Sequence, residues 1–430
     1  MALSLRKRVG FALGDTGFNF VWQSIELYLL FFYLNVLHLP AGWAAAIFFA
    51  GAIVDWVSDP VIGALADRTA ARTGRMRVWM IGAAPVIGVA LPLAFAKPWA
   101  DPVRLFWWAL ASHLLLRISY SAGNIPYAAL TARITTDPAE QARLTGLRMQ
   151  CAALGGLTVA GVYWSAPQLS GGDPGRFFAG AALLGLMIQP LLYLTWTSAT
   201  EVARPRGLVR AYSFKREMLG LFRLARQHRE LQRLLSIVLL AGLTTSVVGS
   251  SILFLFALDL KRAELGYPAT FLPALALLLA TPGWIALHER TGTSATLANA
   301  ALVHLCGLLG LTGAIMFDAP LALSCLCLAV AIVATTGLSV MFWAMVPAIA
   351  TEVGATAGDC EARVYALATT ARKLSQAIAT PLLILGLWAS DVAFGEKQVA
   401  PALALVAVLS AIGILRFAPR PATSDRKTSG

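Results

Sequence analysis

Two aspartates stand one helical turn apart inside an apolar stretch of this chain. Asp55 and Asp59 lie in the run 42–66, which is otherwise apolar and exceeds the roughly 20 residues that a helix needs to cross a bilayer. Their spacing of four residues puts both carboxylates on one helical face. Each carboxylate costs about 2.5–3.5 kcal/mol at mid-bilayer depth, and two like charges a turn apart repel each other. The pair therefore predicts a site for a proton or a small cation.

Polar side chains also share one face in two other apolar stretches. The first stretch carries Asp15, Asn19, Gln23 and Glu26, and the fourth carries Arg117, Tyr120, Ser121 and Asn124. Their offsets of three, four, seven, eight and eleven residues match helical periodicity. Polar groups inside a membrane usually face a water-filled cavity or a partner. We expect Glu26 to lie well inside the membrane, because the apolar run 27–34 follows it.

The elements that must position these residues are membrane-spanning helices. The chain has 430 residues, of which 58% are hydrophobic and 13% charged, with a mean hydropathy of +0.70; soluble proteins have about 25% charged residues. We attribute the net charge of +12 to loop arginines that set membrane topology. No basic module interleaved with aromatic residues supports nucleic-acid binding, and no metal motif or activated nucleophile supports an enzyme.

The apolar pattern predicts twelve helices with both termini on the cytoplasmic side of the inner or plasma membrane. The basic loops alternate along the chain as this arrangement requires. The expected segments are 10–36, 42–66, 78–97, 104–130, 145–167, 176–198, 233–258, 268–288, 295–317, 320–348, 363–390 and 399–417.

We expect the helices to form two bundles joined by a basic linker. The expected ranges are a six-helix bundle at 1–198, a cytoplasmic linker with an amphipathic helix at 199–232, a second six-helix bundle at 233–417 and a cytoplasmic tail at 418–430. On the linker helix, one apolar face is expected to contain Phe214, Met218, Leu221, Phe222 and Ala225. A weak internal repeat aligns 60–69 with 282–291. At the offsets of Asp55 and Asp59 the second half has Leu277 and Thr281, so the expected cation site belongs to the first half.

Three motifs carry a resemblance to a known family. Gly63-x-x-x-Asp67-Arg68, followed by Gly74-Arg75, resembles the loop signature of the major facilitator superfamily. Asp55-x-x-x-Asp59-Pro60-x-x-Gly63 resembles the second helix of its glycoside–pentoside–hexuronide:cation symporters, the branch that contains the melibiose permease. The segment 124–130, Asn-Ile-Pro-Tyr-Ala-Ala-Leu, is similar to the fourth-helix motif of the same branch. The resemblance implies an all-α membrane protein whose twelve helices form two pseudo-symmetric six-helix bundles.

The resemblance and the polar faces together give a set of candidate site residues. The cation-binding candidates are Asp55, Ser58, Asp59 and Ser121, and we expect no metal ion other than Na⁺ there. The substrate-binding candidates are Asn19, Gln23, Glu26, Arg117, Tyr120, Asn124 and Arg148. The coupling candidates are Lys373, Asp67, Arg68 and Arg75. We expect no cofactor beyond the coupling ion, H⁺ or Na⁺, and a monomer in membrane lipid that carries a small molecule.

Two interpretations of Arg117 remain open at this point. An unpaired arginine in mid-membrane is costly, so Arg117 either pairs structurally with Glu26, Asp55 or Asp59, or holds an anionic group of the substrate. The melibiose permease has carboxylates where this chain has Asn19 and Asn124. We expect a symporter for a glycoside, pentoside or hexuronide. The alternatives are a sodium-dependent lysolipid or other organic-anion carrier and, with less support from the second-helix motif, a drug efflux carrier.

Overall fold

The computed structural model describes residues 3–163, 173–202, 214–357, 360–395 and 398–418. Throughout these ranges the regular structure is helical. The chain divides into two compact units, which we describe separately. The first unit comprises 1–227 together with 350–370, and the second comprises 228–349 together with 371–430. Most of the tail expected at 418–430 and residues 203–213 of the expected linker lie outside the described residues.

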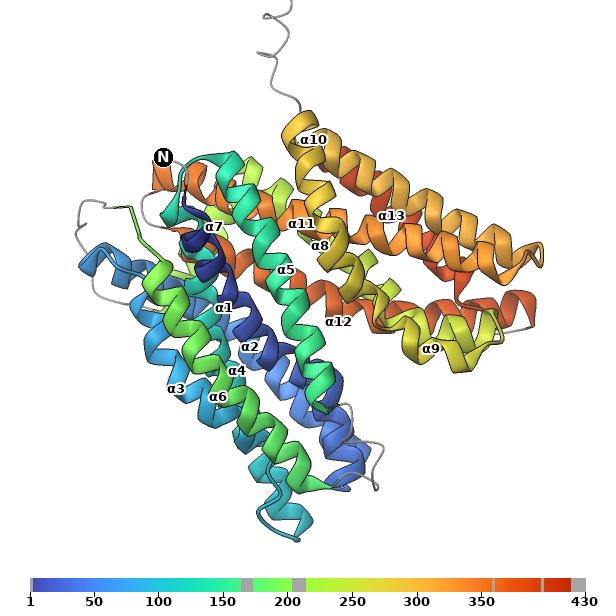
Figure 1. The fold of residues 1–430 in the computed structure, drawn as a ribbon, viewed down its shortest axis with the longest axis horizontal. Coiled ribbons are helices and arrows are strands. Elements are labelled where there is room, and N and C mark those ends of the chain that lie inside the picture. Colours follow the sequence, from blue (N-terminus) through green and yellow to red (C-terminus); the bar gives the residue numbers. More distant parts are fainter. Residues whose placement is uncertain (1–2, 164–172, 203–213, 358–359, 396–397, 419–430) are drawn as a thin grey trace, which may run out of the picture. The chain divides into compact units, whose positions relative to one another are not determined.

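The first unit contains six membrane-length helical segments followed by a short one. α1 (Leu5–Gln23) continues through two π-helical turns, η1 (Ser24–Leu29) and η2 (Phe32–Val36), and is followed by α2 (Ala41–Thr73), α3 (Val78–Ala94), α4 (Pro102–Ile134), α5 (Pro138–Tyr163), α6 (Pro174–Ser198) and α7 (Phe214–Gln227). α1 packs against α5 and α6, α3 packs against α4 and α6, and α2 packs against α4 (Figure 1). The packing order α5–α1–α6–α3–α4–α2 places the polar faces of α1, α2 and α4 within one bundle.

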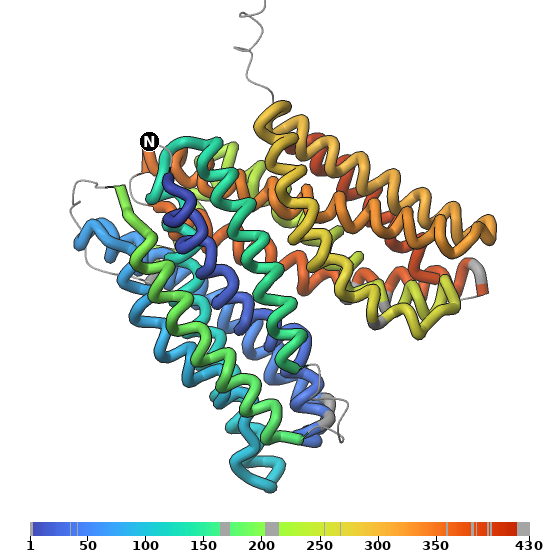
Figure 2. The backbone as a smooth tube through the Cα atoms, viewed as in Figure 1, coloured from blue at the N-terminus to red at the C-terminus, as the bar shows by residue number. Residues whose placement is uncertain are grey.

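The second unit contains the remaining helices, except that the end of α11 and the start of α12, within 350–370, belong to the first unit. They are α8 (Arg229–Phe254), η3 (Leu255–Asp259), α9 (Ala263–Ala269), α10 (Leu272–Met316), α11 (Leu321–Ala357), α12 (Glu361–Phe394) and α13 (Ala400–Phe417). α10 consists of two helices, because Gly292 interrupts it with φ 81° and ψ 169°, a conformation that glycine adopts without steric cost. The tube of α10 folds back on itself between its two parts (Figure 2). Counting α10 as two helices, the described residues contain the twelve membrane helices that the apolar pattern predicts.

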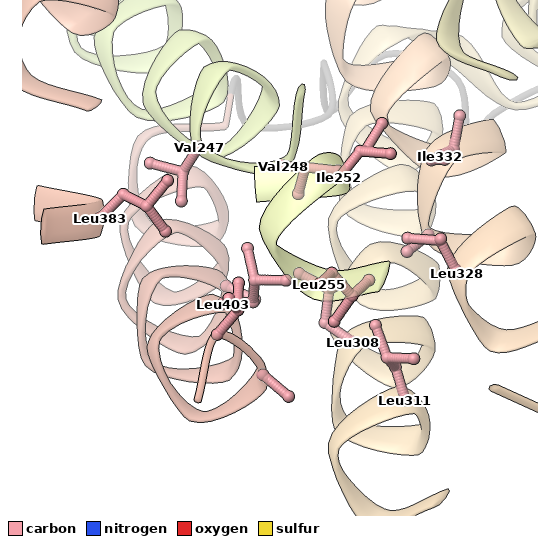
Figure 3. Packing of buried hydrophobic residues seen from close by; sticks show 14 of the residues in the cluster. Val247, Val248, Ile252, Leu255, Leu308, Leu311, Leu328, Ile332, Leu383 and Leu403 are labelled. Atoms are coloured by element: carbon pink, nitrogen blue, oxygen red, sulfur yellow. The ribbon is translucent and has the colours of Figure 1, made fainter. Parts of the chain in front are cut away.

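An apolar core holds the second unit together. Figure 3 shows buried leucine, isoleucine and valine side chains from α8, η3, α10, α11, α12 and α13 meeting in one cluster. Within it Leu255, Leu311 and Ala331 are fully buried. α13 packs against both α8 and α10. Asp259 fixes the start of α13 by accepting hydrogen bonds from the backbone N–H groups of Val399 and Ala400.

Several helices extend well past the apolar runs that predict them. α2 continues to Thr73 and ends at Gly74, whose φ of 72° is the left-handed conformation that terminates helices. Six of the described helices are long and apolar enough to span a membrane by length and composition alone: α2, α6, α8, α10, α11 and α13, with minor differences in their bounds. α1, α4, α5 and α12 are outside this set although they have sufficient length. α1, α4 and α5 carry the polar clusters described below, which lower their hydropathy.

Close contact between α3 and α6 depends on two glycines. A Cβ atom at Gly185 would lie 2.5 Å from the backbone oxygen of Gly88. We expect Gly185→Ala to destabilise the protein by about 1–3 kcal/mol, because the helices must separate to admit the methyl group. Thermal unfolding in detergent, followed by tryptophan fluorescence, measures the effect. Gly82→Ala on α3 is the matched control, since a Cβ there meets no atom within 4 Å. Equal melting temperatures for the two variants would contradict this account of the packing.

Candidate functional site

α2 and α4 face each other along a series of matched positions. Asp55 contacts Arg117, and Asp59 contacts Ser121; in both pairs the partners are separated by 62 residues. The same offset joins Gly51 to His113, because a Cβ at Gly51 would lie 2.5 Å from His113 Nε2. The constant offset shows that the two helices run in the same direction here. The contacts therefore form three rungs, each one helical turn from the next, which we call the α2–α4 ladder.

The middle rung of the ladder is a buried ion pair. Arg117 donates hydrogen bonds from Nε, at 3.0 Å, and from Nη2 to Oδ2 of Asp55. The exposed fractions of the side chains are 12% for Arg117 and 2% for Asp55. The guanidinium carbon also lies 5.9 Å from the centre of the Trp22 ring. Of the three acids that we considered as partners for Arg117, the structure pairs it with Asp55. Removing one member of a buried pair leaves an uncompensated charge, which makes such pairs costly to break.

The third rung places the other carboxylate against a hydroxyl. Ser121 donates a hydrogen bond of 2.6 Å from Oγ to Oδ1 of Asp59, and Asp59 is fully buried. Pro60 follows Asp59 inside α2 and has no N–H group to donate within the helix. Ser58 has a buried hydroxyl without a hydrogen-bond partner among the described residues. The structure thus brings Asp55, Asp59 and Ser121 together on the α2–α4 ladder, while no hydrogen bond joins Ser58 to them.

The first rung holds a buried histidine. His113 is fully buried, and neither ring nitrogen has a hydrogen-bond partner within the described part of the chain. Its ring lies against Tyr33 and Phe48, with centroid distances of 6.4 and 5.1 Å. A buried polar group without a partner is uncommon in folded proteins. His113 therefore adds an imidazole to the two carboxylates of the α2–α4 ladder, one turn from Arg117.

An amide and aromatic surface lies beside the ladder. Tyr120 and Asn124 on α4 are hydrogen-bonded through the Asn124 amide and the tyrosine hydroxyl. The ring of Tyr120 lies 5.9 Å from that of Trp22, centroid to centroid. Trp22, Tyr120, Asn124 and Asn19 are all half-buried. Trp22 is not among the predicted site residues, although it lies on the helical face of Asn19 at an offset of three residues. Half-buried amides and aromatic rings are suited to bind a polar ring compound.

The other two polar residues of the first segment differ in position. Gln23 is half-buried at the end of α1, and its side chain lies 3.5 Å from a Cβ placed at Gly156 on α5. Glu26 lies in the π-helical turn η1 and is exposed. The expectation that Glu26 lies well inside the membrane stays a prediction. The turn of η1 is wider than an α-helical turn, which moves Glu26 off the face predicted from a 3.6-residue period.

Arg148 lies in a separate buried cluster. It donates from Nε to Oδ2 of Asp15 at 2.6 Å and from Nη1 to Oγ1 of Thr131 at 2.8 Å. The hydroxyl of Tyr127 donates to the same oxygen of Asp15 at 2.8 Å, and the guanidinium carbon lies 4.7 Å from the centre of the tyrosine ring. The cluster ties α1, α4 and α5 together, and Asp15 already occupies the guanidinium of Arg148. Asp15, Tyr127 and Thr131 are members of the cluster that were not among the candidates. Asp15 stands four residues before Asn19, and Tyr127 lies in the motif 124–130.

Asp67 lies in a network at the other end of α2. Its carboxylate accepts hydrogen bonds from the backbone N–H groups of Ala362, at 2.9 Å, and Arg363, at 3.0 Å. These are the first-turn N–H groups of α12, whose partial positive charge favours an anion. Nη1 of Arg68 lies 3.8 Å from Oε1 of Glu217 on α7, and Oε2 of Glu217 lies 3.6 Å from Nη2 of Arg363. Asp67 and Arg68 thus connect α2 and α7 to the start of α12 within the first unit.

A second buried arginine completes this network. The side chain of Arg133, at the end of α4, is 1% exposed. Its Nε lies 3.1 Å from Oε2 of Glu201, and its Nη1 lies 3.4 Å from Oε2 of Glu361. Glu201 also accepts hydrogen bonds from the backbone N–H groups of Met76 and Arg77, which precede α3. We had not included Arg133, Glu201 or Glu361 among the candidates. Their charges stand far apart in the sequence, so only the folded chain brings them together.

The two other coupling candidates lie elsewhere. Arg75 is exposed in the turn after α2, where its backbone exchanges hydrogen bonds with the hydroxyl of Thr73. Lys373 is half-buried on the part of α12 that belongs to the second unit. Next to it, Arg372 donates a hydrogen bond of 2.8 Å to Ser246 of α8. The structure therefore does not place Arg75 in the network of Asp67 and Arg68.

The linker contains a helix, α7. α7 spans Phe214–Gln227 and packs against α2. Leu221 and Leu224 are buried, whereas Phe222 is 76% exposed. The apolar face expected to contain Phe222 stays a prediction. The side chain of Phe214 lies outside the described residues.

The contact of Asp67 with α12 leads to a prediction. Asp67→Ala removes the acceptor for two N–H groups, and loss of a helix cap costs about 1 kcal/mol. Because this energy corresponds to about a fivefold change in an opening equilibrium, we expect about fivefold faster maleimide labelling of Cys360. This cysteine is buried directly before α12. The assay uses a background in which the other four cysteines are alanine.

The control for the labelling experiment is Asp137→Ala. Asp137 accepts a hydrogen bond from the N–H group of Ala139 at the start of α5, so this variant loses a comparable contact at a different helix. We expect no change in the labelling rate of Cys360. Equal acceleration by both substitutions would show that labelling reports general loosening and not the contact with Asp67.

Comparisons with known proteins agree with this architecture. The family model "MFS/sugar transport protein" matches residues 10–415. The "Uncharacterized symporter YnaJ" of Bacillus subtilis is 30% identical over 352 residues, 80% of this chain and 74% of that protein. The "Inner membrane symporter YicJ" of Escherichia coli is 32% identical over 206 residues, which cover 47% of this chain and 45% of that protein. The match to YicJ therefore spans less than half of that relative's length.

A more distant relative and a solved structure extend the comparison over almost the whole chain. The "Glucuronide carrier protein homolog" of Escherichia coli is 27% identical over 404 residues, 90% of this chain and 84% of that protein. The crystal structure of a bacterial homologue of the iron transporter ferroportin, in an outward-facing state, superposes with a TM-score of 0.70 at 13% identity. It covers 97% of this chain and 100% of that one. This likeness shows the fold alone. The chain is thus an integral membrane transporter, not an enzyme, and it belongs to the MFS/sugar transport protein family of the major facilitator superfamily.

Proposed function

We propose that the protein is a cation-coupled symporter that carries a glycoside, pentoside or hexuronide by alternating access. One observation carries the proposal. Two carboxylates, Asp55 and Asp59, are buried one turn apart on α2 and are held by Arg117 and Ser121 of α4. Burying two acids at this depth is expensive unless their charge is used. A cation that binds there changes the net charge of the α2–α4 ladder, and this change can be linked to a conformational equilibrium.

The coupling step follows from this charge change. With no cation bound, the carboxylates of the α2–α4 ladder carry more negative charge than Arg117 balances, which favours approach of another positive group. Lys373 on α12 is our candidate for that group. Cation binding removes the excess negative charge and releases the lysine, so the two units become free to rearrange around the substrate. Asp67 and Arg68, which contact the start of α12 and α7, are the candidates that hold the opposite end of α2 during the cycle.

The substrate class rests on the amide and aromatic surface. Asn19, Trp22, Gln23, Tyr120 and Asn124 offer hydrogen-bond donors and acceptors next to two aromatic rings. Arg117 and Arg148 each have a carboxylate partner, and this arrangement favours neutral glycosides and pentosides over hexuronides. The similarity to a glucuronide carrier homolog supports the wider class of sugar derivatives.

We further propose the inner or plasma membrane as the site of action, with both termini in the cytoplasm. The support is the distribution of arginines, which gather at the start of α1, from the end of α2 to the start of α3, and in the segment between α6 and α8. Short basic loops remain on the cytoplasmic side of a membrane. Single cysteines introduced after α1 and after α2 test the orientation. Their accessibility to a labelling reagent is measured from each side of the membrane.

Uptake into reconstituted vesicles tests the proposed function. Vesicles containing the protein are given an inward pH gradient, an inward Na⁺ gradient or neither. They are supplied in turn with radiolabelled methyl galactoside, xylose, methyl glucuronide and lysophosphatidylcholine. We expect gradient-driven accumulation of at least one of the three sugar derivatives. Accumulation of lysophosphatidylcholine alone would assign the protein to lysolipid transport, and accumulation unaffected by either gradient would contradict cation coupling.

A further inference from the structure

One face of α7 is held by the first unit. Leu221 and Leu224 on this face are buried, and the helix packs against α2. Glu217 lies on the same face, where its carboxylate forms ion pairs with Arg68 of α2 and Arg363 of α12. The positions 217, 221 and 224 are separated by four and three residues, which places them along one side of a helix. This face therefore has its partners within the protein.

The opposite face of α7 carries two large apolar side chains that the first unit does not cover. Leu219 is 53% exposed and Phe222 is 76% exposed. Leu219 and Phe222 stand four and seven residues after Lys215, so the three share one side of the helix. The basic residues of the helix are exposed as well: Lys215, Arg216, Arg223 and Arg226. We call these basic residues, together with Leu219 and Phe222, the outward face of α7.

The outward face combines the properties that match a surface of charged phospholipids. Exposed aromatic and leucine side chains among lysines and arginines are typical of helices that lie in the headgroup region of a bilayer. The acidic residue of α7, Glu217, lies on the other face. Among the described residues, no carboxylate pairs with Lys215 or Arg223. A surface of anionic headgroups complements this positive charge, and a neutral lipid surface does not.

α7 lies where α2 leaves the membrane. The apolar run 42–66 within α2 is long enough to cross a bilayer, and Arg68 stands two residues beyond its end. Because Arg68 contacts Glu217, α7 is attached next to the boundary between the apolar layer and water. The lipid headgroups occupy this boundary. The position of α7 therefore favours a lipid surface over a soluble acidic partner as the occupant of the outward face.

We propose that the outward face of α7 docks on anionic phospholipids of the leaflet beside it, with Phe222 and Leu219 inserted between the headgroups. The basic side chains contact the phosphate groups, which arginine binds through paired hydrogen bonds and lysine as a point charge. Through Glu217 the docked helix is connected to Arg68 and Arg363, and so to the contact between α2 and the start of α12. This inference goes beyond the proposed function, since it depends on neither the transported substrate nor the coupling cation.

An environment-sensitive fluorophore at position 222 tests the docking. Phe222→Cys is made in the full-length protein, whose five native cysteines are replaced by alanine, and is labelled with a nitrobenzoxadiazole group. The labelled protein is reconstituted into vesicles of phosphatidylcholine alone, or of an equal mixture of phosphatidylcholine and phosphatidylglycerol. We expect the docking equilibrium, measured as the ratio of lipid-shielded to water-exposed emission, to be at least about tenfold larger in the mixed vesicles.

The control position is Phe317, another strongly exposed phenylalanine. Its side chain is 85% exposed directly after α10, and its neighbour in the chain is the acidic residue Asp318. The same fluorophore on Phe317→Cys should report the same surroundings in both kinds of vesicle. A change in emission of equal size at positions 222 and 317 would show that the fluorophore responds to the lipid mixture itself, and this result would overturn the inference.

A second variant separates electrostatic docking from simple exposure of an apolar ring. Lys215→Gln/Arg223→Gln removes two positive charges from the outward face, and surface substitutions of this kind rarely affect folding. With the fluorophore at position 222, this variant should lose most of the gain seen in the mixed vesicles. The matched control Lys261→Gln/Arg104→Gln removes one lysine and one arginine from exposed positions elsewhere and should keep the gain.

The outcomes separate the inference from the proposed function. A fluorophore at position 222 that stays exposed to water in both kinds of vesicle would overturn the docking of α7. Equal shielding in both kinds of vesicle, or a full gain in Lys215→Gln/Arg223→Gln, would overturn the assignment to anionic lipid. None of these measurements involves uptake of a sugar, so their failure would leave cation-coupled transport in place.

Discussion

Asp59→Asn is expected to abolish gradient-driven accumulation while leaving exchange of substrate across the membrane. Asn cannot take up and release a proton, so transport loses its link to the gradient. The fold should tolerate the change, because the amide oxygen of Asn can still accept the hydrogen bond from Ser121. We expect the free energy of unfolding to change by no more than about 1 kcal/mol. Vesicle uptake of a transported sugar, with and without a pH gradient, measures the effect.

The control for Asp59→Asn is Asp391→Asn. Asp391 is exposed near the end of α12, so the same chemical change occurs outside the α2–α4 ladder. Wild-type accumulation by the control and loss of accumulation by Asp59→Asn would support the coupling role. If Asp59→Asn still accumulates substrate under the gradient, Asp59 does not carry the coupling cation.

Asp15→Asn is expected to reduce stability strongly. The substitution leaves Arg148 buried with one fewer charge partner, and breaking a buried ion pair from one side costs about 3–5 kcal/mol. The side chains of Arg148 and Asp15 are 7% and 9% exposed, and the hydroxyl of Tyr127 loses the same acceptor charge. The loss of unfolding free energy is measured by thermal unfolding in detergent, calibrated against a protein whose unfolding free energy is known.

Two further variants separate a buried pair from an ordinary surface pair. Asp15→Asn/Arg148→Gln should lose less stability than the sum of the two single variants, because no charge is left unpaired. Arg176→Gln removes a partner of Asp173 in a pair whose side chains are 49% exposed, and exposed pairs contribute about 0–1 kcal/mol. A loss for Asp15→Asn as small as that for Arg176→Gln would show that the cluster around Arg148 is hydrated and does not stabilise the fold.

Two arginines of the first unit differ in their roles although both are substrate-binding candidates. Arg117 and Arg148 are each paired with an aspartate in the structure. Arg117 lies at the edge of the amide and aromatic surface, near Trp22, where a change of its partner can alter the site. Arg148 joins three helices inside the bundle. Neutral substrates fit both findings, because neither guanidinium is required to bind them.

The sequence by itself determined the membrane character, the number of helices and the rung positions on α2. Apolar runs predict spans because no water is available for the backbone inside a bilayer, and a spacing of four residues places Asp55 and Asp59 on one face whatever packs against them. The same periodicity placed Arg117 and Ser121 on one face of α4. These features depend on neighbours within a few residues, so a linear pattern contains them.

Only the tertiary structure decided which charges are paired. Arg117 could have met Glu26, Asp55 or Asp59 by composition alone, and the choice of Asp55 depends on the register between α2 and α4, a constant offset of 62 residues. The pairs Asp15–Arg148 and Arg133–Glu361 join positions more than a hundred residues apart. The π-helical turn that exposes Glu26 also escapes a 3.6-residue pattern. Register and helix contacts arise from packing across the whole bundle, and a local pattern does not specify them.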